Sequence, residues 1–286
     1  MSYRIITDTC CDLWQQFYKE LNTEVISLSV NFKGQTYDSY SESWLKDFYN
    51  GLRDGEVAQT AAVNPEGWKS VIEPVVAGGE DALVLAFSSG LSTTYQSAVI
   101  AADELMEQYP ERSIRVVDSL CASMGQGLLL WHACKQRDAG LSLDELTAWC
   151  EDNKLHLCHW FTVDDLMYLK RGGRVSAATA LVGTMLQIKP VMHVDNEGHL
   201  VKVSTARGRK GSLDALVKKF VETALPGEND TIFISHGDCK EDAEYVANKL
   251  KAEYGVKEAV IYYIGAVIGS HSGPGTVALF FLGDNR

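Results

Sequence analysis

Short apolar runs alternate with amphipathic segments along the first half of the chain. Residues 82–87 (ALVLAF) form a run typical of a buried parallel strand, and apolar residues then recur at helical spacing from Ala98 to Tyr109. Three such crossings from strand to helix are expected, within residues 4–21, 82–109 and 114–136. This alternation predicts a mainly parallel sheet with helices on both faces, a three-layer α/β/α arrangement.

Two further elements interrupt this alternation. Residues 24–40 contain an alternating strand pattern around Lys33 and Gly34, which predicts a strand and a hairpin. Residues 41–52 have the pattern of a short amphipathic helix.

The pattern changes near residues 150–157, so we place a domain boundary there, between a domain of residues 1–155 and one of residues 156–286. Thr162 and Asp165 have the spacing of a capping box for a first short helix, which the glycines at 172 and 173 end. Ser176 then starts an apolar helix over residues 177–188, which Pro190 ends.

The rest of the second domain mixes strands and helices. A hairpin is expected over residues 191–206, with its turn at 196–198. Helix, strand and helix follow at 212–225, 231–237 and 241–254, and two apolar strands, 259–270 and 276–283, end the chain. The second domain is therefore expected to be α+β with a mixed sheet, so the fold class is α/β with two domains.

Composition indicates a globular protein of the reducing cytoplasm. Of 286 residues 46% are hydrophobic, no apolar run is long enough to span a bilayer, and the first residues do not resemble a signal peptide. The seven cysteines include no CxxC pair, so neither a disulfide framework nor a metal site is expected. The net charge of −12 disfavours nucleic acid and stable membrane anchoring.

Charge is unevenly distributed along the chain. The acidic excess lies in residues 1–155, whereas residues 202–210 contain Lys202, Arg207, Arg209 and Lys210 without an acidic residue. Such a patch is either ordinary solvated surface or a docking site for an acidic partner.

Hydroxyl groups gather where the strand at 82–87 meets its helix. Five of the seven residues from 88 to 94 are Ser or Thr, and Thr93 with Gln96 has capping-box spacing. The hydroxyls either cap the helix or, with its free amides, bind an anion. The other predicted strands of the parallel sheet also end in polar residues, and such ends gather at the ligand-binding edge. These polar ends are Thr7 and Asp8, Ser88 and Ser89, and Asp118 and Ser119.

Three other positions are candidates for ligand contact. Thr60 lies in an irregular segment before Pro65, and His271 begins the turn HSGPG between the last two predicted strands. Lys170, Arg171 and Arg174 lie at the end of a predicted helix, where cations either complement the helix dipole or bind an anion.

Common enzyme motifs are absent from the chain. There is no GxGxxG, GxxxxGK[ST], HExxH or GxSxG sequence, so nucleotide binding, zinc hydrolysis and a nucleophile elbow have no support. A serine hydrolase that uses Ser92 and His271 on acyl esters stays an alternative. A receptor for a small phosphorylated ligand is a third hypothesis, which predicts a small wet pocket.

Seven segments together resemble the DegV family in order and spacing. They are TDTCCDL at 7–13, QTAAVNP at 59–65, SSGLSTTYQSA at 88–98, VVDS at 116–119, LKRGGRV at 169–175, ARGRKGS at 206–212 and HSGPG at 271–275. The resemblance covers essentially the whole chain. It implies a two-domain protein that binds one long-chain fatty acid such as hexadecanoate, with the carboxylate between the domains and the acyl chain in an apolar tunnel.

The resemblance also assigns roles to individual positions. It implies that Thr60, Ser92 and His271 contact the carboxylate, supported by Ser89, Arg171 and Ser272. Two positions depart from the family pattern, since Ala61 replaces a serine and Thr93 a glycine.

Some family members act as the carrier subunit of a fatty acid kinase, in which a separate ATP-binding subunit phosphorylates the bound carboxylate. By resemblance Arg207 and Arg209 lie on the side that faces that kinase. The chain itself is then expected to be a monomeric lipid carrier without catalytic residues, cofactor or metal, important for phospholipid metabolism.

Physical chemistry is consistent with a fatty acid ligand. Burial of a methylene group contributes about 0.8 kcal/mol, so the acyl chain would supply most of the affinity. A buried carboxylate needs charge-assisted hydrogen bonds, which hydroxyls and helix amides can donate.

Overall fold

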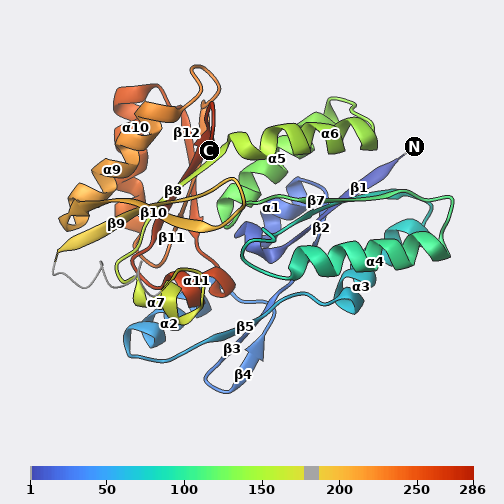
Figure 1. Cartoon of the computed structure of the whole chain (residues 1–286), viewed down its shortest axis with the longest axis horizontal. Helices are drawn as coiled ribbons and strands as arrows, with labels where there is room; N and C mark the ends of the chain where they lie inside the picture. Colours follow the sequence, from blue (N-terminus) through green and yellow to red (C-terminus); the bar gives the residue numbers. More distant parts are fainter. Residues whose placement is uncertain (1, 177–186) are drawn as a thin grey trace.

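The computed structural model describes residues 2–176 and 187–286, which contain a parallel sheet, a mixed sheet and a small third sheet (Figure 1). The parallel sheet has the strand order β2-β1-β6-β7. Its strands are β1 (Tyr3–Asp8), β2 (Thr23–Ile26), β6 (Asp81–Ala86) and β7 (Ile114–Asp118). The first half of the chain therefore contains the predicted parallel sheet.

Helices cover both faces of the parallel sheet. Its alternating side chains explain the arrangement, since Ile6 and Val84 pack with α3 and α4 while Ile5 and Leu83 pack with α5 and α6. These helices are α3 (Pro65–Ala77), α4 (Thr94–Gln108), α5 (Met124–Asp138) and α6 (Leu143–Asn153), and the short η1 (Thr9–Cys11) and α1 (Gln15–Glu20) follow β1. The predicted three layers are confirmed.

A small antiparallel sheet lies below the parallel one in Figure 1 and has the order β4-β3-β5. Its strands are β3 (Ser29–Phe32), β4 (Gln35–Tyr37) and β5 (Gln59–Ala61). The hairpin turn at Lys33 and Gly34 is where the sequence predicts it, and both residues have positive φ. Helix α2 (Glu42–Arg53) follows, and Ser41 caps it by accepting a hydrogen bond from the Trp44 amide.

The mixed sheet has the order β10-β9-β8-β13-β11-β12, in which β11 and β12 are parallel and the other pairs are antiparallel. Its strands are β8 (Leu157–Thr162), β9 (Ile188–Val194), β10 (Leu200–Arg207), β11 (Thr231–His236), β12 (Glu258–Tyr263) and β13 (Val277–Leu282). Helices α9 (Gly208–Thr223) and α10 (Lys240–Tyr254) cover one face, and η2 (Lys154–His156) precedes β8.

Helix α5 packs against the other face of the mixed sheet, so it lies between the two large sheets. One hydrophobic cluster joins Leu83 and Leu85 of the parallel sheet through Leu128 to Phe161 and Phe280 of the mixed sheet. The strands of the parallel sheet precede residue 155 and those of the mixed sheet follow it. The domain boundary itself stays a prediction. None of the helices in the two described ranges is long and apolar enough to cross a membrane.

The predicted strand over residues 259–270 is wrong in its second half. The strand ends at Tyr263, and Ala266–Ser272 form helix α11. A short apolar run fits a buried helix as well as a strand, and here the helix packs against α2. Gly269 permits this packing because a Cβ there would lie 2.5 Å from the Tyr49 hydroxyl. His271 therefore lies in the last turn of a helix.

The capping box predicted at Thr162 and Asp165 is also wrong. Thr162 is the last residue of β8 and is buried, while Asp165 accepts a hydrogen bond from the Met167 amide at the start of α7 (Met167–Arg171). The predicted stop at residues 172–173 is confirmed, since Gly172 caps α7 and Gly173 has φ +73°.

Most of the apolar helix predicted over residues 177–188 lies outside the described residues. Its last residue, Ile188, begins strand β9, and Pro190 lies within that strand rather than ending a helix. Proline is tolerated there because β9 pairs with β8 only through Met192 and His193, so Pro190 has a strand partner on one side alone.

Candidate functional site

A cavity of about 500 Å³ lies between the carboxyl edge of the parallel sheet, the mixed sheet and α11. Most of its wall is apolar, because alternation along β8 and β13 directs Phe161, Ala278 and Phe280 towards α5 and the cavity. Polar side chains from several separate segments also line it. Among them are Thr60, Ser89, Ser92, Arg174, His271 and Ser272. A long apolar ligand with one polar end matches this lining.

In the hydroxyl-rich turn between β6 and α4, one serine supports the fold and two others line the cavity. Ser88 is fully buried and its Oγ donates to the Gly198 carbonyl at 3.0 Å, so it joins the turn to the β9–β10 hairpin. Gly90 allows the same contact, because a Cβ there would lie 2.7 Å from the Glu197 carbonyl oxygen. Ser89 and Ser92 line the cavity.

The capping box predicted at Thr93 and Gln96 is wrong. Thr93 is the N-cap residue of α4 but makes no side-chain cap, because its φ of −79° and ψ of 5° differ from the extended conformation of a cap. Ser92 caps the start of the helix instead. Its Oγ accepts a hydrogen bond from the Thr94 amide at 3.2 Å and shares a hydrogen bond of 2.8 Å with Thr94 Oγ1.

Thr60 and His271, which are 211 positions apart, are in direct contact. Thr60 Oγ1 and His271 Nε2 are 2.9 Å apart, which joins β5 to the last turn of α11. Gly172 lies against the same ring, and a Cβ at that position would be 2.2 Å from His271 Nδ1. Glycine is therefore required at the end of α7 for the imidazole to reach Thr60.

His271 is uncharged at neutral pH. Burial, with a smaller contribution from the Arg174 charge, lowers the pKa of His271 to about 4. The neutral ring has one N–H donor and one acceptor nitrogen, so it can pair with a hydroxyl or donate to an anion without forming an ion pair.

The cation at the cavity is Arg174, three residues beyond the predicted Arg171. Arg174 donates to the carbonyls of Gly172 and Leu91, and its burial lowers its pKa. Arg171 is exposed, lies outside the residues that line the cavity, and its guanidinium lies 5.3 Å from the Tyr168 ring centre. Both arginines belong to the segment LKRGGRV, and the backbone turn at residues 172–173 determines which of them lies at the cavity.

Ser272 is buried and lines the cavity beside His271. Within the described part of the chain its Oγ has no hydrogen-bond partner. A buried hydroxyl without a partner is costly, so a ligand acceptor at this position would be stabilised.

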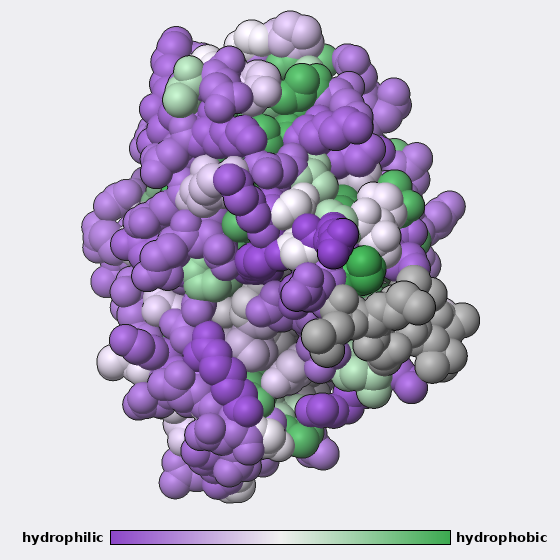
Figure 2. Space-filling model, turned by 90° about the vertical axis from the view of Figure 1, so that its left-hand side faces the viewer, coloured by the Kyte–Doolittle hydropathy of each residue, from purple (hydrophilic) through white to green (hydrophobic). Residues whose placement is uncertain are grey.

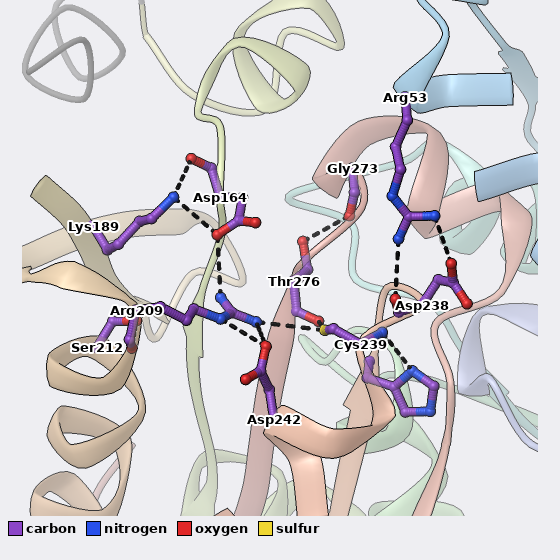
Figure 3. A network of polar contacts seen from close by, with 11 residues as sticks. Arg53, Asp164, Lys189, Arg209, Ser212, Asp238, Cys239, Asp242, Gly273 and Thr276 are labelled. Carbon is purple, nitrogen blue, oxygen red and sulfur yellow. Dashed lines mark hydrogen bonds and ion pairs between the residues drawn. The ribbon is translucent and has the colours of Figure 1, made fainter. Parts of the chain in front are cut away.

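Arg207 and Arg209, the predicted docking residues, lie apart from the cavity lining at the start of α9. Arg207 is exposed at the end of β10, whereas Arg209 forms ion pairs with Asp242 at 2.7 Å and Asp164 at 3.4 Å (Figure 3). Much of the charge of Arg209 is therefore neutralised by its neighbours.

Two alternatives find little support in this geometry. Ser92 Oγ pairs with Thr94 and His271 Nε2 with Thr60, so the described contacts include no Ser92–His271 hydrogen bond of the kind a serine hydrolase uses. The large apolar wall differs from the small wet pocket of a phosphate receptor. Among the described residues one group has metal-ligand spacing, Asp195, Glu197 and His199, and it lies on the β9–β10 turn outside the cavity.

Sequence comparison identifies relatives that cover nearly the whole chain. Residues 2–284 match a family model described as an uncharacterised protein of the DegV family. A DegV domain-containing protein of Clostridium perfringens is 44% identical, and the match covers 99% of this chain and 98% of that protein.

Solved structures show the same fold. A DegV family protein from Thermus thermophilus, described by its fatty acid binding, has a TM-score of 0.88 and 30% identity over 99% of this chain and 100% of that one. A Thermotoga maritima protein whose structure revealed a fatty acid binding function has a TM-score of 0.84 and 27% identity over 99% of each chain.

Proposed function

The chain belongs to the DegV family, and from that membership we propose that it binds one long-chain fatty acid in the cavity described above. The acyl chain lies along the apolar wall, and the carboxylate is held by Thr60, Ser92 and His271, which all line the cavity. Structural neighbours of this family bind fatty acids. The observation that carries the proposal is the continuity of a large apolar cavity with one cluster of hydroxyl, imidazole and guanidinium groups.

Neutral donors suit a carboxylate at this position. Hydroxyl groups of Thr60, Ser92 and Ser272 can each donate to it, with Ser89 as further support, and the neutral imidazole of His271 adds an N–H. Arg174 supplies a partly buried positive charge nearby, although Arg171 was the residue expected to do so. These groups together offset the desolvation of the carboxylate.

We further propose that the protein presents its ligand to a separate ATP-binding kinase and does not catalyse a reaction alone. A carboxylate oxygen would attack the γ-phosphorus of ATP held by the kinase, the bond to the β–γ bridging oxygen would break, and ADP would leave.

Exposed Arg207 is the better placed of the two docking candidates, because Arg209 is paired with acidic neighbours. The face formed by β9, β10 and α9 is largely hydrophilic (Figure 2). That surface suits a polar, reversible contact.

We also propose a domain boundary, an oligomeric state and a cellular location from the sequence. A boundary near residue 155 would place the ligand between two domains. A monomer would suffice for binding if the described residues of one chain that line the cavity hold the ligand. A cytoplasmic location would keep the seven free cysteines reduced.

Mass spectrometry of an organic extract of the purified protein tests the function directly, and a released long-chain fatty acid is expected. Calorimetric titration of the delipidated protein with hexadecanoate then tests the site. Thr60→Ala and Ser92→Ala should each weaken binding about tenfold, because each removes a hydrogen bond to a charged group.

Ser204→Ala, at an exposed position of β10, is the matched control and should bind like the parent. Parental affinity in both site variants would refute the assigned contacts, and an empty extract with no binding of any fatty acid would refute the function. Labelling of Ser92 by a fluorophosphonate would instead favour the hydrolase.

A further inference from the structure

A fully buried carboxyl group, Asp12, lies behind the ligand site. Asp12 ends η1 with φ 52° and is 5% exposed. Its Oδ2 accepts a 2.5 Å hydrogen bond from Ser123 Oγ, and its carboxyl also accepts from the backbone amide of Gly265. Ser123 lines the cavity and shares a 2.8 Å hydrogen bond with Ser235 of β11. Asp12 therefore contacts both the cavity wall and the segment that begins α11.

Asp12 and Tyr40 together cap helix α11 from outside the helix. Gly265 is the N-cap residue and offers no side chain, so the first amides of α11 need other acceptors. Asp12 accepts from Gly265, and the Tyr40 hydroxyl accepts from the Ala266 amide at 3.1 Å. A Cβ at residue 265 would lie 2.5 Å from Asp12 Oδ1, so only glycine allows this approach.

Helix α11 carries four of the residues that line the cavity. His271 and Ser272 lie in its last turn, and Val267 and Ile268 line the apolar wall. The helix has seven residues, or about two turns, so the position of its first turn determines that of its last. A shift at Gly265 would move the His271 ring away from Thr60.

The surroundings of Asp12 favour an uncharged carboxylic acid. Burial raises the pKa of Asp12 to about 8, while the hydrogen bonds from Ser123 and Gly265 partly oppose this and the Asp8 carboxyl adds to it. The other titratable groups whose own pKa Asp12 influences are thiols and phenols, which are uncharged near neutral pH. They are Cys10, Cys11, Tyr18, Tyr40, Tyr49 and Tyr262. Among the described residues these interactions include no cation that would stabilise a carboxylate.

We propose that Asp12 is a positioning residue for the head-group site, which it serves by holding the first turn of α11. When Asp12 is protonated, the hydrogen bond between its Oδ2 and Ser123 Oγ reverses, so that the acid O–H donates to Ser123 and Ser123 can donate to Ser235, while the carbonyl oxygen of Asp12 accepts from Gly265. His271 and Ser272 are thereby set against Thr60 and Ser92. This inference rests on the proposed fatty acid binding.

The test compares Asp12→Asn with Asp12→Ala in calorimetric titrations with hexadecanoate. An amide can donate to Ser123 and accept from Gly265 as the neutral acid does, so Asp12→Asn should bind within about twofold of the parent at neutral pH. Asp12→Ala removes the acceptor for Gly265 and should weaken binding about tenfold. Asp152→Ala, at an exposed position of α6 outside this hydrogen-bond network, is the matched control and should bind like the parent.

A pH profile separates positioning from a general structural role. From about pH 7 to about pH 9 the parent should lose affinity about tenfold, because ionised Asp12 carries an unpaired buried charge, whereas Asp12→Asn should not. The NMR signal of the His271 imidazole in the ligand-free protein should move with pH in the parent and stay constant in Asp12→Asn.

The inference would be overturned if Asp12→Ala bound hexadecanoate with the affinity of the parent at neutral pH. It would also be overturned if the affinities of the parent and Asp12→Asn depended on pH in the same way, or if the His271 signal did not change when Asp12 ionises. The pH profile needs only the isosteric Asn variant, so it remains decisive if Asp12→Ala does not fold. If the parent binds no fatty acid at all, the proposed function fails, and the His271 signal still tests the role of Asp12.

Discussion

Two neighbouring turns of the parallel sheet have similar polar sequences and different roles. The turn after β1 contains Thr7, Asp8 and Asp12, which are all buried, and their side chains bond to the protein itself. The turn after β6 also buries Ser88 but presents Ser89 and Ser92 to the cavity. Both turns lie at the carboxyl edge of the sheet, next to the cavity. Position at that edge therefore does not make a polar residue a ligand contact.

The buried turn supports the open one. Asp8 Oδ2 accepts hydrogen bonds from the Phe87 amide at 2.8 Å and from Gln126 Nε2 at 3.3 Å, and its Oδ1 accepts from the Cys10 amide at 2.9 Å. Phe87 directly precedes the hydroxyl-rich turn, so the first turn fixes the backbone from which Ser89 and Ser92 project. The turn after β1 therefore stabilises the fold, whereas the turn after β6 presents side chains to the cavity.

The largest effect on stability should come from Asp8→Ala. This variant leaves the amides of Cys10 and Phe87 without their acceptor in a fully buried position and removes one of the three acceptors of Gln126 Nε2. We expect the free energy of unfolding to fall by about 3 kcal/mol, measured by urea denaturation.

Asp118→Ala is the matched control for this change. Asp118 occupies the same place at the end of β7 and accepts from the Ser89 and Leu120 amides, but it is partly exposed. Water can replace its oxygen, so its loss should cost about 1 kcal/mol. Equal losses for the two variants would contradict the distinction between a buried supporting turn and an open one.

Sequence pattern predicted the sheets but not the division between these turns. The parallel strand direction, the mixed sheet and the polar edge follow from period and composition, whereas Thr60, Ser92 and His271 were expected at one site because of the family resemblance. The structure brings all three to the cavity. Which of Thr7, Asp8 and the serines face it depends on packing against α5 and the mixed sheet, and that information is not local.

The positions of helix α11 and Arg174 could likewise not be predicted from the local sequence. The apolar run at residues 259–270 fits either a strand or a buried helix, and only its contacts with α2 decide. Arg171 and Arg174 differ by three positions around a glycine turn, and the φ of +73° at Gly173 directs the chain so that Arg174 reaches Leu91. Such backbone geometry has no signature in residue type alone.

The second prediction concerns Asp12 in the buried turn and the pH dependence of stability. Because burial raises the pKa of Asp12 to about 8, the folded chain keeps a proton that the unfolded chain releases. The contribution of Asp12 to the free energy of unfolding should therefore fall as pH rises towards about 8, by at most about 1.4 kcal/mol per pH unit.

Comparison with Asp12→Asn isolates this contribution between about pH 7 and about pH 8. Burial lowers the pKa of His132, His236 and His271 to about 4, so these groups take up protons on unfolding near pH 7 and oppose the effect of Asp12, but they do so equally in both proteins. Urea denaturation should therefore show a more negative slope of the free energy of unfolding against pH in the parent than in Asp12→Asn. An identical slope in both proteins would show that Asp12 is already ionised at neutral pH.

The third prediction addresses the cation beside the open turn. Arg174→Ala removes the donor to the Leu91 carbonyl and the positive charge near the carboxylate, so fatty acid affinity should fall by about 1 kcal/mol, or about fivefold. The pKa of His271 should also rise towards its ordinary value, because the Arg174 charge lowers it. Calorimetry and an NMR titration of His271 measure the two effects.

Arg171→Ala is the control for Arg174, since Arg171 is exposed and outside the cavity lining. It should leave both affinity and the His271 titration unchanged. A larger loss of affinity in Arg171→Ala than in Arg174→Ala would restore the original assignment of the cation.

The smallest effect is expected for the stability of Ser92→Ala, the variant that should most clearly lose ligand. Ser92 is partly exposed, and its hydrogen bonds to Thr94 cap one end of α4 in a position that water can reach. The free energy of unfolding of the ligand-free protein should change by no more than about 0.5 kcal/mol. A protein that loses affinity about tenfold while keeping its stability separates contact from support. If Ser92→Ala instead destabilised the ligand-free chain as much as Asp8→Ala, both turns would be structural, and the serine would affect the ligand only through the fold.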